Sequence, residues 1–81
     1  MTLAQIATLR KWGYQIKKVW GESKFLFRKN GGCAYVIEYD DGILVVSGKN
    51  RPKDDRVARG LKWDLSCICD KPVLTYEDWF R

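Results

Sequence analysis

The chain has 81 residues with 15 Lys or Arg, 10 Asp or Glu, a formal net charge of +5 and no histidine. Histidine is the usual general acid or base near neutral pH and the commonest metal ligand, so its absence removes most routes to catalysis. A chain of this length buries only roughly 60–65% of the surface that it exposes when unfolded, which leaves little room for an interior active site. We therefore expect one compact domain over residues 1–81, no enzymatic activity, and a function carried by the surface.

No apolar run approaches the ~18 residues of a membrane span, and Met1–Gln5 leads into an amphipathic segment without the regions of a signal peptide. Cys33, Cys67 and Cys69 make an odd number, which favours a reducing compartment over a disulfide framework. A zinc site would need Cys33 nearby and a fourth ligand such as Asp70, whereas burial as small apolar side chains in a strand needs neither. We expect a cytoplasmic protein with free thiols and with no metal ion, cofactor or membrane contact.

The first element is predicted to be a helix. Thr2 and Gln5 have the spacing of a capping box, and Gly13 stands where a C-terminal cap is expected. Between these signals, apolar residues recur at helical spacing. They are Leu3, Ile6, Ala7 and Leu9.

From Tyr14 onward the helical period gives way to alternation, which predicts strands. Phe25 and Phe27 would share one face of their strand. Lys24, Leu26 and Arg28 would share the other. The predicted strands are residues 14–20, 24–29, 33–39 and 43–47, with turns at 21–23, 30–32 and 40–42.

Residues 43–46 are apolar at every position, which indicates a central strand covered on both faces, with the N-terminal helix on one of them. Farther along, Asp54 is placed to cap a short helix carrying Val57 and Leu61, although Gly60 disfavours it. Residues 65–69 predict another strand, 71–72 a break and 75–81 a terminal helical turn. The expected fold is α+β, an N-terminal helix packed on a four- to five-stranded antiparallel sheet with short C-terminal helical segments.

The first 30 residues carry seven Lys or Arg against the single Glu22. In the first hairpin these cations interleave with aromatic rings, and cations beside aromatics are what single-stranded nucleic acid requires. An ordinary amphipathic hairpin, with its rings in the core, has the same pattern. The candidate binding residues of this hairpin are Lys17, Lys18, Trp20, Lys24, Arg28 and Lys29.

A second basic stretch supplies further candidates at Arg51, Arg56 and Arg59, although its pattern favours a solvated loop and helix face. The terminal Trp79-Phe80 is expected to dock on the core or on a partner. Glu22-x-Lys24 has the pattern of half of a metal-dependent nuclease site, but a hairpin turn accounts for it more simply.

The segment Ile6–Ile16, followed by Gly21-Glu22-Ser23, resembles the opening helix and hairpin of the small HicA toxin ribonucleases. That family carries its catalytic histidine just after the equivalent glycine. Here Glu22 or Ser23 takes that position, so the resemblance implies no ribonuclease activity. In general profile the chain resembles the phage-encoded anti-CRISPR proteins, which are tiny, single-domain, cytosolic and poor in motifs.

The expected function is therefore that of a small non-enzymatic inhibitor, of the anti-CRISPR or anti-defence type, that occupies a surface of a nucleic-acid-handling protein complex. The basic aromatic hairpin is its expected contact face, because Trp, Tyr and Arg are the usual anchors of protein interfaces. Two alternatives stay open. The same face could bind DNA or RNA directly, or the chain could be a metal-dependent nuclease.

Overall fold

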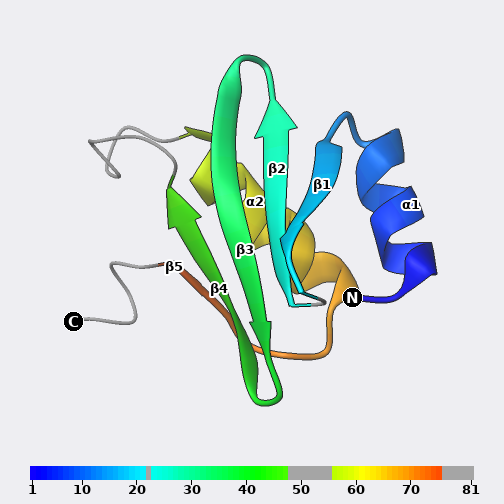
Figure 1. Ribbon diagram of the computed structural model, residues 1–81, viewed down its shortest axis with the longest axis vertical. Coiled ribbons are helices and arrows are strands. Elements are labelled where there is room, and N and C mark those ends of the chain that lie inside the picture. Colours follow the sequence, from blue (N-terminus) through cyan, green and yellow to red (C-terminus); the bar gives the residue numbers. More distant parts are fainter. Residues whose placement is uncertain (22, 48–55, 76–81) are drawn as a thin grey trace.

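The computed structural model describes residues 1–21, 23–47 and 56–75 (Figure 1). Two helices and five strands lie in these ranges, which confirms the α+β class. In chain order they are α1 (Leu3–Lys11), β1 (Gln15–Trp20), β2 (Lys24–Lys29), β3 (Gly32–Tyr39), β4 (Gly42–Ser47), α2 (Arg56–Ile68) and β5 (Val73–Thr75).

Helix α1 begins and ends where the sequence signals predict. The amide of Gln5 donates to Thr2 Oγ1 at 3.1 Å and the amide of Thr2 donates to Gln5 Oε1 at 3.0 Å, which completes the capping box. After the helix, Gly13 adopts a φ of 99°, a conformation that residues with a side chain rarely take. Leu9 is the buried residue that anchors the helix to the core.

The sheet has the order β1-β2-β3-β4-β5. The first four strands form an antiparallel meander, as predicted, and two-residue turns join β2 to β3 and β3 to β4. Between β2 and β3 both turn residues have positive φ, 53° at Asn30 and 80° at Gly31, as a two-residue hairpin turn of the right twist requires.

The prediction of a strand over residues 65–69 was wrong, because α2 continues through Ile68. Ala58, Leu61 and Leu65 are buried at helical spacing, so one helix stripe meets the sheet along the whole segment. Gly60 lowers helix propensity by about 1 kcal/mol relative to alanine, and this burial outweighs it.

The fifth strand also differs from the prediction, because β5 pairs parallel to β4 in an otherwise antiparallel sheet. Helix α2 carries the chain back along the sheet, so the next strand starts from the same end as β4, and parallel neighbours need such a crossover. The amide of Ile43 donates to the carbonyl of Pro72 at 2.8 Å at the start of this pairing. Thr75, expected to begin a helical turn, ends this strand, and residues 76–81 lie outside the described ranges.

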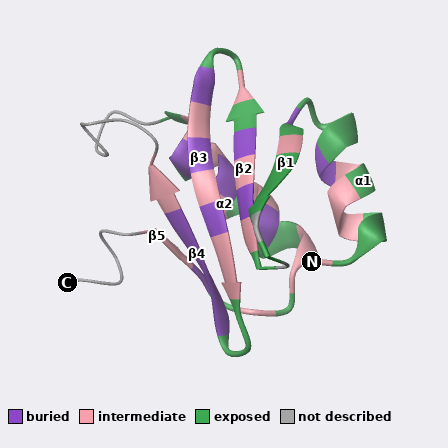
Figure 2. Cartoon of the chain, viewed as in Figure 1, coloured by how far each residue is buried: buried purple, intermediate pink, exposed green. Residues whose placement is uncertain are grey.

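The core lies between α2 and one face of the sheet (Figures 1 and 2). Along β2 and β3, buried residues alternate with more exposed ones, as period-two patterning requires. Helix α1 flanks β1 at the sheet edge, so the expectation that it covers the 43–46 strand was wrong. The core residues are Leu9, Tyr14, Phe25, Phe27, Ala34, Val36, Ile43, Val45, Ala58, Leu61, Leu65 and Val73.

Candidate functional site

The strand register divides the cations of the first hairpin between two faces of the sheet. Lys17 pairs with Leu26, so it lies on the same face as Lys24 and Arg28, as predicted for the latter two. Lys18 and Lys29 share the side of the core residues, because Lys18 pairs with Phe25 and Lys29 follows Phe27 by two positions. The hairpin therefore does not present one continuous basic surface.

The aromatic rings of this hairpin belong to the core. Phe25 and Phe27 are 5% and 0% exposed, and Tyr14, which precedes β1, is 4% exposed. Phe27 makes edge-to-face contacts with both other rings, at centroid distances of 6.5 and 5.8 Å. The interpretation as an amphipathic hairpin with buried rings is confirmed for these residues. The side chain of Trp20 lies outside the described part of the chain.

The face of the sheet turned away from α2 is covered by no described helix (Figure 1). Two cross-strand rows run along it, one through Leu26 and Tyr35 and the other through Ile37 and Leu44. The first row begins at Lys17 and ends at Val46. The second begins at Trp20 on β1, continues through Lys24 and ends at Leu74. A third row joins Arg28 to Gln15 on β1 and Cys33 on β3. We call this surface the open sheet face, and its residues are Gln15, Lys17, Lys24, Leu26, Arg28, Cys33, Tyr35, Ile37, Leu44, Val46 and Leu74.

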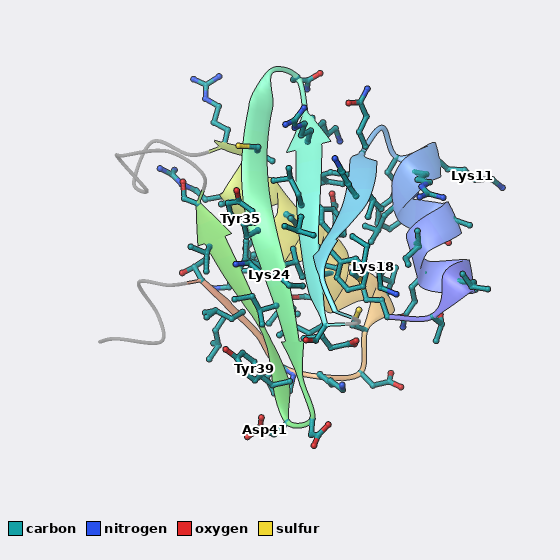
Figure 3. All side chains as sticks on the ribbon, in the orientation of Figure 1. Lys11, Lys18, Lys24, Tyr35, Tyr39 and Asp41 are labelled. Carbon is teal, nitrogen blue, oxygen red and sulfur yellow. The ribbon has the colours of Figure 1, made fainter. Side chains whose placement is uncertain are left out.

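Charge and apolar surface are separated on the open sheet face. The cations lie on β1 and β2, whereas the aliphatic side chains continue across β3, β4 and β5. The Lys24 ammonium lies 5.1 Å from the centre of the Tyr35 ring, over the middle of the sheet (Figure 3). Such a contact fixes the lysine above the ring and covers part of the ring. Lys17 and Arg28 are exposed beside it.

Lys29 and Arg56 come together elsewhere, at a cleft of about 600 Å³ between the β2–β3 turn and the start of α2. Tyr14 and Asp64 also line this cleft, and the Lys29 ammonium lies 4.6 Å from the Tyr14 ring centre. The Tyr14 hydroxyl donates to Asp64 Oδ2 at 2.5 Å. Burial, and then this hydrogen bond, raise the pKa of Tyr14 well above its ordinary value. Because the Asp64 carboxylate offsets one of the two cations, the cleft lacks the concentrated charge of an anion site.

The remaining predicted residues lie away from the open sheet face or outside the described residues. Arg59 is exposed on α2, as is Arg56 one turn earlier, and neither lies on the open sheet face. Arg51, Glu22 and the terminal Trp79-Phe80 lie outside the described residues, as does Asp54.

Sequence reasoning missed the aliphatic half of the open sheet face. The sequence carries a signal for this apolar surface. Residues 43–46 are apolar at every position, and Ile37 continues the apolar run of its own strand. The same pattern predicts a strand that is buried on both faces. In the structure Ile43, Leu44 and Val45 are 1%, 7% and 1% exposed, so the centre of β4 is buried on both faces although no described helix covers the side of Leu44.

Cys33 lies in β3, within the strand predicted for it, whereas Cys67 and Cys69 differ from the prediction. Cys67 is exposed on α2 and Cys69 is half-buried just after it, so they do not share one side of a strand. Burial is the main cause that raises the pKa of Cys69. All three cysteines are free, and in the described ranges no three Cys, Asp or Glu side chains gather where they could hold a metal ion.

No helix of the described residues is long and apolar enough to cross a membrane. No protein-family model, curated protein or solved structure matches this chain.

Proposed function

We propose that this protein is a non-enzymatic binding protein that occupies the surface of a nucleic-acid-handling protein complex through its open sheet face. One observation carries the proposal, namely an aliphatic centre with Lys17, Lys24 and Arg28 along one side. Protein interfaces combine a desolvated apolar centre with a polar rim. The absence of histidine from the sequence supports binding rather than catalysis.

The composition of the open sheet face favours a protein partner over nucleic acid. A single-strand binder needs aromatic rings on which bases stack. The rings of Phe25 and Phe27 are buried, and Lys24 lies over the Tyr35 ring. Partly exposed aliphatic side chains such as Ile37 and Val46 offer bases little, whereas they complement an apolar protein surface.

The partner surface should carry acidic groups beside an apolar patch. Opposite charges across an interface speed association and fix its register, while like charges cost several kcal/mol. Proteins that handle nucleic acid are themselves basic along the nucleic-acid channel. The binding surface on the complex should therefore lie outside that channel, and inhibition would result from blocking a movement or a subunit contact.

The narrower proposal is an inhibitor of the anti-CRISPR or anti-defence type. Its support is the general profile of the chain, a single small domain that lacks catalytic and metal-binding motifs. Purified protein would be added to guide-loaded CRISPR effector complexes of several types, and target cleavage measured. Inhibition that depends on the open sheet face would support the proposal, and unchanged cleavage by every effector type would reject the narrower form.

The broader proposal is tested by affinity capture from a bacterial lysate, with and without nuclease treatment. Wild-type protein should retain a defined protein complex after nuclease treatment. The triple variant K17E/K24E/R28E should lose it, because reversed charges face the acidic partner. The variant should still fold, since exposed substitutions usually change stability by no more than about 0.5 kcal/mol each.

A matched control reverses Arg56 and Arg59, which are exposed on α2. This variant should still capture the complex. If the triple variant folds and captures it as well as wild type does, the open sheet face is not the contact surface. If capture disappears with nuclease in every variant, nucleic acid bridges the interaction and direct nucleic-acid binding replaces the proposal.

A further inference from the structure

Helix α2 turns a tryptophan away from the core. Successive residues of a helix are related by about 100°, so Trp63 lies about 160° around the helix from the fully buried Leu65. Trp63 is 72% exposed, the highest value for an aromatic ring among the described residues. Tryptophan side chains without a role at the surface are mostly buried, so the exposure of Trp63 needs an explanation.

The neighbours of Trp63 on α2 leave its ring uncovered. Residues three and four positions away are the ones that touch a helical side chain. On the C-terminal side they are Ser66 and Cys67, and on the N-terminal side Gly60 has no side chain. The Ser66 hydroxyl donates back to the carbonyl of Lys62 at 2.7 Å, which keeps it against the helix. Arg59 is the single long neighbour.

The same face of α2 is cationic. Arg59 and Arg56 are exposed about one and two turns before Trp63, respectively. The one acidic residue of α2, Asp64, lies on the side of the helix and accepts the Tyr14 hydrogen bond. The macrodipole adds positive potential at the Arg56 end. Asp64 shares the cleft beside the β2–β3 turn with Arg56 and Lys29, whereas no acidic residue of α2 lies three or four positions from Arg59.

We infer that the outer face of α2, formed by Arg56, Arg59 and Trp63, binds single-stranded nucleic acid. Trp63 stacks on an unpaired base while the two arginines neutralise phosphates. A protein partner would need an apolar surround to bury, and the residues around this indole are glycine, serine, cysteine and arginine. The inference goes beyond the proposed function and does not depend on it, because the two surfaces are on opposite sides of the sheet.

The test measures fluorescence anisotropy of a short labelled oligothymidine titrated with the full chain at several salt concentrations. Wild type should bind weakly and lose affinity steeply with salt. W63A should bind about tenfold more weakly at low salt, because stacking on one base is worth on the order of a factor of ten. W63F, which keeps a ring, should recover most of the loss. R56Q/R59Q should flatten the salt slope by about 0.7 for each arginine.

Two matched variants and a duplex probe identify the face. W12A removes a tryptophan that is 42% exposed on α1, and K17Q/R28Q removes two exposed cations from the open sheet face. Both should bind the oligothymidine nearly as wild type does. With a duplex of equal length, W63A should equal wild type, because paired bases cannot stack on the indole.

The inference is overturned if folded W63A binds the single strand as tightly as wild type. It is also overturned if K17Q/R28Q loses as much affinity as R56Q/R59Q, since the binding would then follow net charge alone. Thermal melting by circular dichroism verifies that each variant is folded. Loss of the captured protein complex in W63A, with oligothymidine binding unchanged, would assign Trp63 to a protein interface instead.

Discussion

The open sheet face and the outer face of α2 are both cationic, yet they are built for different partners. On the sheet, the cations border partly exposed aliphatic side chains, which include Ile37 and Val46. On the helix, the cations border one uncovered indole among small polar residues. Positive charge alone therefore does not identify a ligand. The chemistry between the charges does, because aliphatic surface favours protein and an isolated ring favours a base.

Both faces depend on one thin core, and the largest expected effect is its loss. Phe27 is fully buried between α2 and the sheet, so F27A should lower the free energy of unfolding by about 3–5 kcal/mol. This is a large share of the stability of a domain this small. Urea denaturation measures it, and both binding activities should fail together.

The adjacent residue provides the control for F27A. Leu26 points to the open sheet face and is half-buried, so L26A should cost much less stability and should weaken capture of the protein complex alone. If F27A were nearly as stable as L26A, the placement of the core on the α2 side of the sheet would be wrong.

The next effect concerns the contact that holds α2 against the sheet. A Cβ at Gly32 would lie 2.5 Å from Val57 Cγ2 and 3.4 Å from its Cβ, closer than a short branched side chain can accommodate. G32A should therefore lower the free energy of unfolding by about 1–3 kcal/mol. Thermal and urea melts measure this loss.

The rescue variant makes this prediction specific. V57A removes the obstructing methyl groups, so the double variant G32A/V57A should be more stable than the sum of the two single changes predicts. Additive losses would mean that the close approach of strand and helix is not the source of the strain.

A smaller effect is expected near the end of β3, where Glu38 pairs with one cation that precedes α1 and with another that follows α2. Its carboxylate pairs with the Met1 amine, and Lys71 Nζ lies 3.6 Å from Oε2. Burial alone would raise the pKa of Glu38, but the hydrogen bond to the amine and the nearby cations outweigh it and hold the pKa below 4.5. The contribution to stability is therefore present above pH 4.5 and is lost as the pH falls through the lower folded-state pKa.

In E38Q this acid-dependent loss should be absent, and at neutral pH the variant should be less stable by about 1 kcal/mol or less. Urea melts of both proteins between neutral and acidic pH give the difference. Parallel pH profiles of wild type and E38Q would show that the pairing contributes nothing.

The smallest changes in stability should separate the two faces most clearly. K17Q/R28Q and R56Q/R59Q each remove two exposed cations, so each substitution should change the free energy of unfolding by about 0.5 kcal/mol or less. K17Q/R28Q should weaken capture of the protein complex alone, and R56Q/R59Q should weaken binding of the oligothymidine alone. If each variant lost the same affinity in both assays, the two faces would act as one electrostatic surface.

Much of the fold could be predicted because its signals are local. The Thr2 capping box, the positive-φ turn at Asn30-Gly31 and the alternation in residues 24–29 are each set by neighbours in sequence. The alternation also placed Lys24 and Arg28 on one face correctly. The candidate site was predicted only in part, since strand periodicity says which residues share a face and not which face is buried.

The sequence by itself determined the first helix, the four-stranded meander and the partition of side chains between its faces, because local backbone preferences and period-two alternation decide them. Only the tertiary structure decided that α2 runs through Gly60 to Ile68, returns the chain for a parallel β5, and covers the face of Phe27. Burial against distant strands outweighs the local cost of a glycine, and it thereby leaves the opposite sheet face and Trp63 outside the core.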